Sequence, residues 1–196
     1  MRARPCRAVE VPLTIGLAFD AVLDAARSGA PWAFERLWAE LSSPVAGYFR
    51  GQGAAEPDDL TSEVFLGVFA GLKSFTGSEE RFRSWVFTIA HHRLVDERRR
   101  TVRRYWTTTP DLSILDQMGG DAEADALDAL GNQRVAEMCA GLSPDQREVL
   151  LLRVVGDLTV EQVATILGKT VGGVKATQRR ALSSLRKSLQ REGVLL

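Results

Sequence analysis

The chain has 196 residues, of which 45% are hydrophobic, and it carries 25 basic and 25 acidic side chains. This composition suffices for one globular core or two small ones, and it excludes a chain that is disordered throughout. Charged residues interrupt every apolar stretch before it reaches the roughly 18 residues that a membrane-spanning helix needs. The first residues do not resemble a secretory signal, so we expect a cytoplasmic protein without membrane insertion.

Charge is unevenly distributed although the total is zero. Residues 81–104 have a net charge of +6 and residues 169–191 one of +7, while residues 111–137 between them have −6. Solvated helix faces are one interpretation, but like charges repel, and clusters of this size indicate a partner of opposite charge. A polyanion that contacts the chain at two separate places is the simplest such partner.

The N-terminal half predicts four helices. Apolar residues recur at helical spacing and no long segment alternates with a period of two, so we expect an all-α fold. The expected helices cover residues 19–28, 32–48, 58–72 and 81–100. The third carries an apolar stripe of Leu60, Val64, Phe65, Val68 and Phe69. We expect these helices to form one domain, residues 16–105, after a mobile N-terminus at residues 1–15.

Residues 106–131 are expected to be an acidic linker, because they combine threonine, proline, glycine and acids with few core residues. A second small helical domain, residues 132–196, follows. Ser143 and Thr159 each begin a capping box, which stabilises a helix start by about 1 kcal/mol. The break at residues 168–170 has the length and turn chemistry of a helix-turn-helix.

The last predicted helix separates apolar from basic residues. At about 100° per residue, Val174 and Ala181 share one face and the cations occupy the opposite arc. The second helix of a helix-turn-helix lies in the DNA major groove, and its N-terminal residues reach deepest. The expected base contacts are Lys175, Ala176 and Arg179. The expected phosphate contacts are Arg180, Arg186 and Lys187.

Aromatic residues and arginines alternate near residues 81–106, a pattern suited to single-stranded nucleic acid, whose bases stack on rings. Most of these rings are expected in the core, because Phe82 and Trp85 share a helical face with Val86. Phe87 and His91 point the other way, and they form either a second packing face or a contact surface.

No enzyme is predicted. After His91, the pair His92 and Asp96 could share an ion, but no third ligand is evident nearby and the HExxH arrangement is absent, so no metal site is expected. The sequence has no phosphate-cradling glycine loop, nucleophile elbow or paired catalytic carboxylates. Cys6 and Cys139 cannot form a disulfide framework or a four-cysteine zinc site. We therefore expect no cofactor.

Several ordered motifs resemble those of one family. They are AFERLW at residues 33–38, DDLTSEVFL at 58–66, FRSWVFTIA at 82–90, LSPDQREVL at 142–150, EQVA at 161–164 and GGVK at 172–175. In this order and spacing, which covers nearly the whole chain, they are similar to the extracytoplasmic-function (group four) sigma factors of bacterial RNA polymerase.

The resemblance implies that the chain binds core RNA polymerase and directs it to promoter DNA. The helix at residues 58–72 would dock on the polymerase clamp, with the contacts Asp58, Asp59, Leu60, Glu63, Val64 and Leu66. The last helix would read the upstream promoter element as duplex. The downstream element would be melted and held by Phe75, Phe87, His91, His92, Arg98 and Arg99. The acidic linker would pass through the polymerase channel, and family members are commonly held by an anti-sigma factor.

Two alternatives remain. A free-standing helix-turn-helix regulator would bind an operator without polymerase, and an interaction module would use its basic faces to bind a regulator protein. The N-terminal domain argues against the first, because such a regulator has no use for a polymerase-docking helix followed by an aromatic and arginine-rich one.

Overall fold

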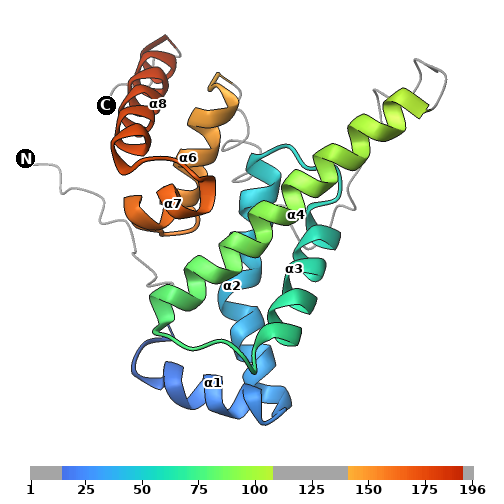
Figure 1. Ribbon diagram of the computed structural model, residues 1–196. Coiled ribbons are helices and arrows are strands. Elements are labelled where there is room, and N and C mark those ends of the chain that lie inside the picture. Colours follow the sequence, from blue (N-terminus) through green and yellow to red (C-terminus); the bar gives the residue numbers. More distant parts are fainter. Residues whose placement is uncertain (1–14, 108–140, 192–196) are drawn as a thin grey trace, which may run out of the picture.

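The computed structural model of the protein describes residues 15–107 and 141–191, and every regular element in these two ranges is helical (Figure 1). The all-α prediction is therefore confirmed for this part of the chain. None of the described helices is long and apolar enough to cross a membrane. The predicted mobile N-terminus, at residues 1–15, and the acidic linker, at residues 106–131, lie almost entirely outside the described residues.

The first helical unit contains a short 3-10 helix and four α-helices. Their bounds are η1 Gly16–Ala18, α1 Phe19–Arg27, α2 Pro31–Gly51, α3 Pro57–Gly71 and α4 Glu79–Thr107. Proline stands at the first position of α2 and of α3, where its missing N–H has no intrahelical partner to lose. Helix α4 runs seven residues past its predicted end at residue 100, because residues 101–107 contain no glycine or proline to stop it.

Helices α2, α3 and α4 share one apolar core. The predicted stripe of α3 is confirmed, since Leu60, Val64, Phe65 and Val68 are buried and Phe69 is half-buried. The face of α4 predicted to be core is also confirmed, with Phe82 and Val86 buried and Trp85 half-buried. Burying an apolar side chain of this size stabilises the fold by roughly 1.5–3 kcal/mol.

The second helical unit consists of α6 Pro144–Val154, α7 Val160–Leu167 and α8 Val171–Arg191. Both predicted capping boxes are present. The Ser143 hydroxyl accepts a hydrogen bond from the backbone N–H of Gln146, and the Thr159 hydroxyl accepts one from that of Gln162. Gly168 ends α7 in the left-handed conformation at φ 60°, which glycine adopts without steric cost. The predicted helix-turn-helix is thus formed by α7, the turn and α8.

The two units are packed against each other. Helix α6 contacts α2, and α7 contacts α4. Figure 1 shows α6, α7 and α8 gathered beside the first half of α4, while the second half of α4 extends away from them. Buried residues of both units belong to one continuous apolar cluster.

Candidate nucleic-acid interface

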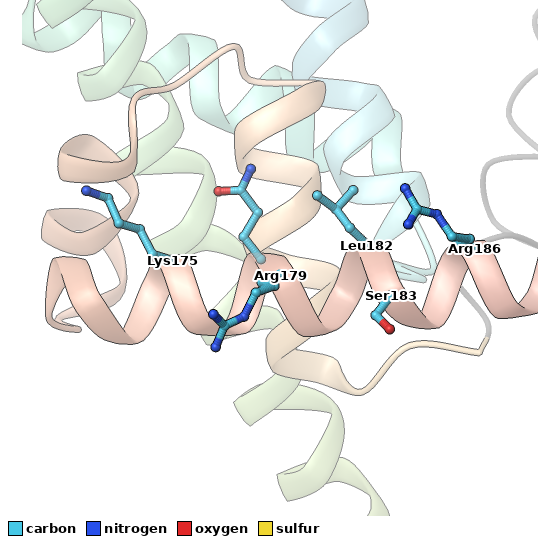
Figure 2. Close-up of a pocket in the computed structure, with 6 residues that line it drawn as sticks. Lys175, Arg179, Leu182, Ser183 and Arg186 are labelled. Atoms are coloured by element: carbon cyan, nitrogen blue, oxygen red, sulfur yellow. The ribbon is translucent and has the colours of Figure 1, made fainter.

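Helix α8 presents a basic outer face. Val174 and Ala181 are fully buried against the rest of the unit. The cations predicted to contact DNA are all exposed: Lys175, Arg179, Arg180, Arg186 and Lys187. Figure 2 shows Lys175, Arg179 and Arg186 spaced along α8 around a shallow depression that Leu182 and Ser183 also line. The face is therefore positively charged, accessible and long enough to follow a groove.

Some of the predicted contact residues and basic residues also interact with the rest of the second unit. Ala176 is half-buried, and Arg180 Nη2 donates a hydrogen bond to Thr177 Oγ1 at 3.1 Å. Lys169, which the charge count placed in the basic block, forms an ion pair with Asp145 at 2.6 Å. This pair joins the turn of the helix-turn-helix to the first turn of α6. Sequence spacing did not reveal it, because the partners lie 24 positions apart.

The predicted contact face of α4 is partly covered. Phe87 is fully buried, with its ring centroid 5.9 Å from that of Tyr48. The His91 side chain is 15% exposed, and its Nδ1 lies 2.9 Å from Oε1 of Glu148 in α6. Of the two interpretations left open for Phe87 and His91, the structure shows the packing face. Phe87 cannot reach a base in this arrangement, because α4 turns it toward α2.

The other predicted downstream contacts vary in exposure. His92, Arg98 and Arg99 are exposed. Arg98 donates from Nη2 to the backbone oxygen of Gln52 at 3.2 Å and to its Oε1 at 2.9 Å, which joins α4 to the end of α2. Phe75 is half-buried and stacks on Trp85 with ring centroids 5.1 Å apart. His92 and Arg99 are therefore the members of this set that stand free of the packed core.

The predicted polymerase contacts on helix α3 fall into two groups, one accessible to solvent and one buried. Asp58 and Asp59 are exposed in its first turn, and Leu66 is 70% exposed. Glu63 is half-buried and lies 3.7 Å from Arg93 of α4. The two remaining members are buried and cannot contact a partner's surface, because the apolar stripe turns them into the core: Leu60 and Val64.

Two family models match the chain. The Sigma-70 region 2 model matches residues 44–104, and the Sigma-70, region 4 model matches residues 132–185. SigD of Mycobacterium tuberculosis, an ECF RNA polymerase sigma factor, is 30% identical over 186 residues, which are 91% of this chain and 87% of SigD. The chain belongs to the ECF sigma factors of the sigma-70 family.

Other relatives carry the same description. BldN of Streptomyces coelicolor is 31% identical over 170 residues, which are 86% of this chain but only 64% of BldN. ShbA of Streptomyces griseus is 33% identical over 132 residues, which are 66% of this chain and 69% of ShbA. The region 2 match spans most of α2 together with α3 and α4, and the region 4 match includes α6, α7 and most of α8.

Solved structures show the same fold. CnrH, in complex with the cytosolic domain of CnrY, has a TM-score of 0.61 at 23% identity and covers 87% of this chain and 96% of that one. The sigma factor RpoE, in complex with the anti-sigma factor NepR from Bartonella quintana, has a TM-score of 0.57 at 22% identity and covers 80% and 96%.

Two tryptophans that were not among the predicted site residues are exposed. Trp32 is 54% exposed and Trp38 is 40% exposed, both on α2. The Trp38 ring lies 4.6 Å from that of Phe65 in α3, so it sits at the border of the exposed α3 face. Large exposed aromatic side chains are typical of interaction surfaces. A search for tryptophans at positions outside the apolar stripes would have found them.

The pKa values of Tyr48 and Glu80 are shifted for different physical reasons. Burial raises the pKa of Tyr48 well above its usual value, and the nearby Glu148 carboxylate raises it further. At the start of α4, a hydrogen bond from Ser78 lowers the pKa of Glu80. Within the described ranges, no three His, Cys, Asp or Glu side chains are grouped to hold a metal ion.

Proposed function

We propose that this sigma factor is the promoter-specificity subunit of a bacterial RNA polymerase and has no catalytic activity of its own. It works in the cytoplasm, where it binds core polymerase through α3 and promoter DNA through α8 and α4. The single observation that supports this most is the match of both sigma-70 regions, in order, to two helical units of which the second exposes a basic recognition helix.

The DNA roles are assigned by position on α8 and α4. Lys175, Ala176 and Arg179 lie near the start of α8 and read the upstream element, since the start of a recognition helix reaches base edges. Arg180, Arg186 and Lys187 bind phosphates. His92 and Arg99 contact the downstream element, with Phe75 and Arg98 beside them.

The polymerase contact is assigned to the exposed face of α3, with Asp58, Asp59, Glu63 and Leu66 as its members. Residues 106–131 connect the polymerase-binding domain, residues 16–105, to the upstream-reading domain, residues 132–196. An anti-sigma factor is a further proposed partner, because RpoE, which shares this fold, forms a complex with the anti-sigma factor NepR.

Run-off transcription with purified core polymerase tests the proposal. Templates are genomic fragments selected for binding to the reconstituted holoenzyme, and core polymerase alone is the control. We expect discrete transcripts only when the sigma factor is present. A chain that binds duplex tightly by itself but adds no initiation would instead be a free-standing regulator, which the match to region 2 does not favour.

A further inference from the structure

We propose that Arg27 of α1 is a positioning residue for promoter melting, which orients one peptide of the loop between α3 and α4 toward the separated downstream strand. That peptide joins Phe75 to Thr76. The inference rests on the proposed function, in which Phe75 lies beside the downstream contacts, and it gives α1 a role that the proposed function does not.

The guanidinium of Arg27 is bonded at two places. Its Nη2 donates a hydrogen bond to the backbone oxygen of Phe75, which lies 48 positions further along the chain. Its Nη1 forms an ion pair with Oδ1 of Asp24 at 2.9 Å, one turn earlier on α1. The Asp24 carboxylate therefore holds the Arg27 side chain in the orientation that reaches the loop. Figure 1 shows the connection from α3 to α4 running beside α1.

The position of the Phe75 oxygen fixes the direction of the next N–H. In a planar trans peptide the C=O and the N–H point in opposite directions, and no peptide bond of the described residues is cis. The Thr76 N–H therefore points away from Arg27. Thr76 is exposed, and its N–H has no acceptor among the residues that the structure describes. The loop thus presents an outward-facing donor, of the kind that binds phosphate oxygens in protein–DNA complexes.

Other contacts hold the ends of the loop and the Phe75 ring. The ring stacks on Trp85 with centroids 5.1 Å apart. A Cβ at Gly71 would lie 2.8 Å from Cζ2 of Trp85, so the indole lies directly against the end of α3. At the start of α4, the Glu79 carboxylate accepts hydrogen bonds from the backbone N–H groups of residues 15 and 16. Removing the arginine therefore frees one peptide and leaves the loop attached.

The surroundings of Thr76 suit a separated strand better than a duplex. Phe75 and Trp85 are only half-buried. An unpaired base can stack on an accessible ring, whereas the bases of a duplex are stacked on each other. The proposed downstream contacts His92 and Arg99 lie further along α4, so a strand that follows this helix toward its start arrives at the loop.

Transcription from paired and pre-melted templates tests the inference. The two templates share one non-template strand, but in the second the downstream element is mismatched, so no base pair has to open. We expect Arg27→Ala to lower run-off transcription from the paired template roughly threefold to tenfold, the effect of about one hydrogen bond. The loss on the mismatched template should be less than about twofold, because strand contacts no longer have to offset the cost of unpairing. Equal losses on both templates would overturn the inference, since a smaller folded fraction lowers both alike.

Three further variants separate positioning from folding. Arg27→Lys keeps a cation that can donate to the Phe75 oxygen, and it should recover most of the lost transcription. Asp24→Asn removes the charge that orients Arg27 from a side chain that is itself 74% exposed, so it should change the template ratio in the same direction as Arg27→Ala. Arg36→Ala is the matched control, because Arg36 pairs only within α2, with Glu40 at 3.9 Å, and it should leave the ratio unchanged.

Thermal unfolding shows whether each variant is folded. If Arg27→Ala is not, Asp24→Asn decides, and an unchanged template ratio in Asp24→Asn would overturn the inference. No transcription by the parent chain from either template would count against the proposed function, and the measurement that follows would then decide the inference alone.

Amide hydrogen exchange measures the loop in the free protein without polymerase. The Phe75 N–H donates to the backbone oxygens of Gly71 at 3.2 Å and Leu72 at 3.3 Å, so we expect it to exchange slowly in the parent. Exchange at residues 73–78 should be faster in Arg27→Ala and equal to the parent in Arg36→Ala. Unchanged exchange in Arg27→Ala would show that the loop does not depend on this arginine, and would overturn the inference.

Discussion

Arg179 of α8 is the side chain whose role the helix geometry predicts most sharply. It is exposed near the start of the helix, on the face opposite the buried Val174 and Ala181. Its guanidinium can donate two parallel hydrogen bonds to a guanine edge, which a phosphate contact does not require.

Arg179→Ala is therefore expected to weaken upstream-element binding by roughly 1–3 kcal/mol and to relax base preference at one position. Holoenzyme binding to a library of upstream sequences measures both effects. Lys187→Ala is the matched control, and it should weaken binding to all sequences about equally. An equally uniform loss for Arg179→Ala would assign Arg179 to a phosphate instead.

Tyr48 is expected to make stability depend on pH in the alkaline range. Burial raises the pKa of Tyr48 in the folded state, so the unfolded chain loses this proton first as pH rises past about 10. The contribution of Tyr48 to the free energy of unfolding is complete below that pH and decreases above it. The measurement is urea unfolding of the wild type and of Tyr48→Phe between pH 8 and about 11.5, which is roughly the range over which an unfolded tyrosine ionises. We expect the wild type to lose stability relative to the variant as the pH rises. Parallel curves would mean that Tyr48 is solvated in the folded protein.

Helix α3 has one exposed face and one face buried in the core. Leu66 is 70% exposed and Val64 is fully buried, although only one residue separates them. An exposed leucine contributes little to the core, whereas a buried valine contributes through transfer from water and through packing.

Leu66→Asp is expected to lower the affinity for core polymerase and to leave the melting temperature nearly unchanged. Val64→Ala is expected to reduce the free energy of unfolding by about 1.5–3 kcal/mol. Pull-down with core polymerase and thermal unfolding, both applied to both variants, check this division. A large loss of stability in Leu66→Asp would show that residue 66 supports the fold and not an interface.

Much of the fold could be predicted from residues that are close together in the sequence. The helix starts at Ser143 and Thr159 follow from side chains that cap the backbone within three residues, and the exposed basic face of α8 follows from helical periodicity. The burial of Leu60 and Val64 was also foreseeable, because both belong to the apolar stripe of α3. The resemblance to the family motif alone does not show which of its residues face the core.

Other features depend on partners far apart in the chain. Nothing near Phe87 or His91 indicates that α2 and α6 cover them, since Glu148 lies 57 positions beyond His91. The same holds for Arg98, whose hydrogen bonds to Gln52 span 46 positions. Sequence periodicity shows which residues share a face, but it does not show which helix lies against that face.

At the scale of the whole molecule, the distribution of charge governs how binding responds to salt. Arg98 and Arg99 are exposed neighbours on α4, but Arg98 is hydrogen-bonded to Gln52 whereas Arg99 lies 3.6 Å from Asp96. Each phosphate contact that is lost lowers the slope of log affinity against log salt, because fewer counterions are released.

Arg99→Ala is expected to reduce that slope for holoenzyme–promoter binding by roughly 0.7–0.9 without loss of stability. Arg98→Ala is expected to lower stability as well, because Gln52 loses its partner. Filter binding over a range of salt concentrations, together with thermal unfolding, distinguishes the two variants. An unchanged slope for Arg99→Ala would place that side chain away from DNA.

The ends of α4 and α6 determine how far the two units can move apart. Helix α4 ends at Thr107 and α6 begins at Pro144, and the 36 residues from 108 to 143 have a contour length of at most about 130 Å. The 29 residues of α4 itself rise only about 44 Å. The number of connecting residues would thus permit a span far longer than the longest helix, so the covalent connection by itself does not fix the distance between the two units.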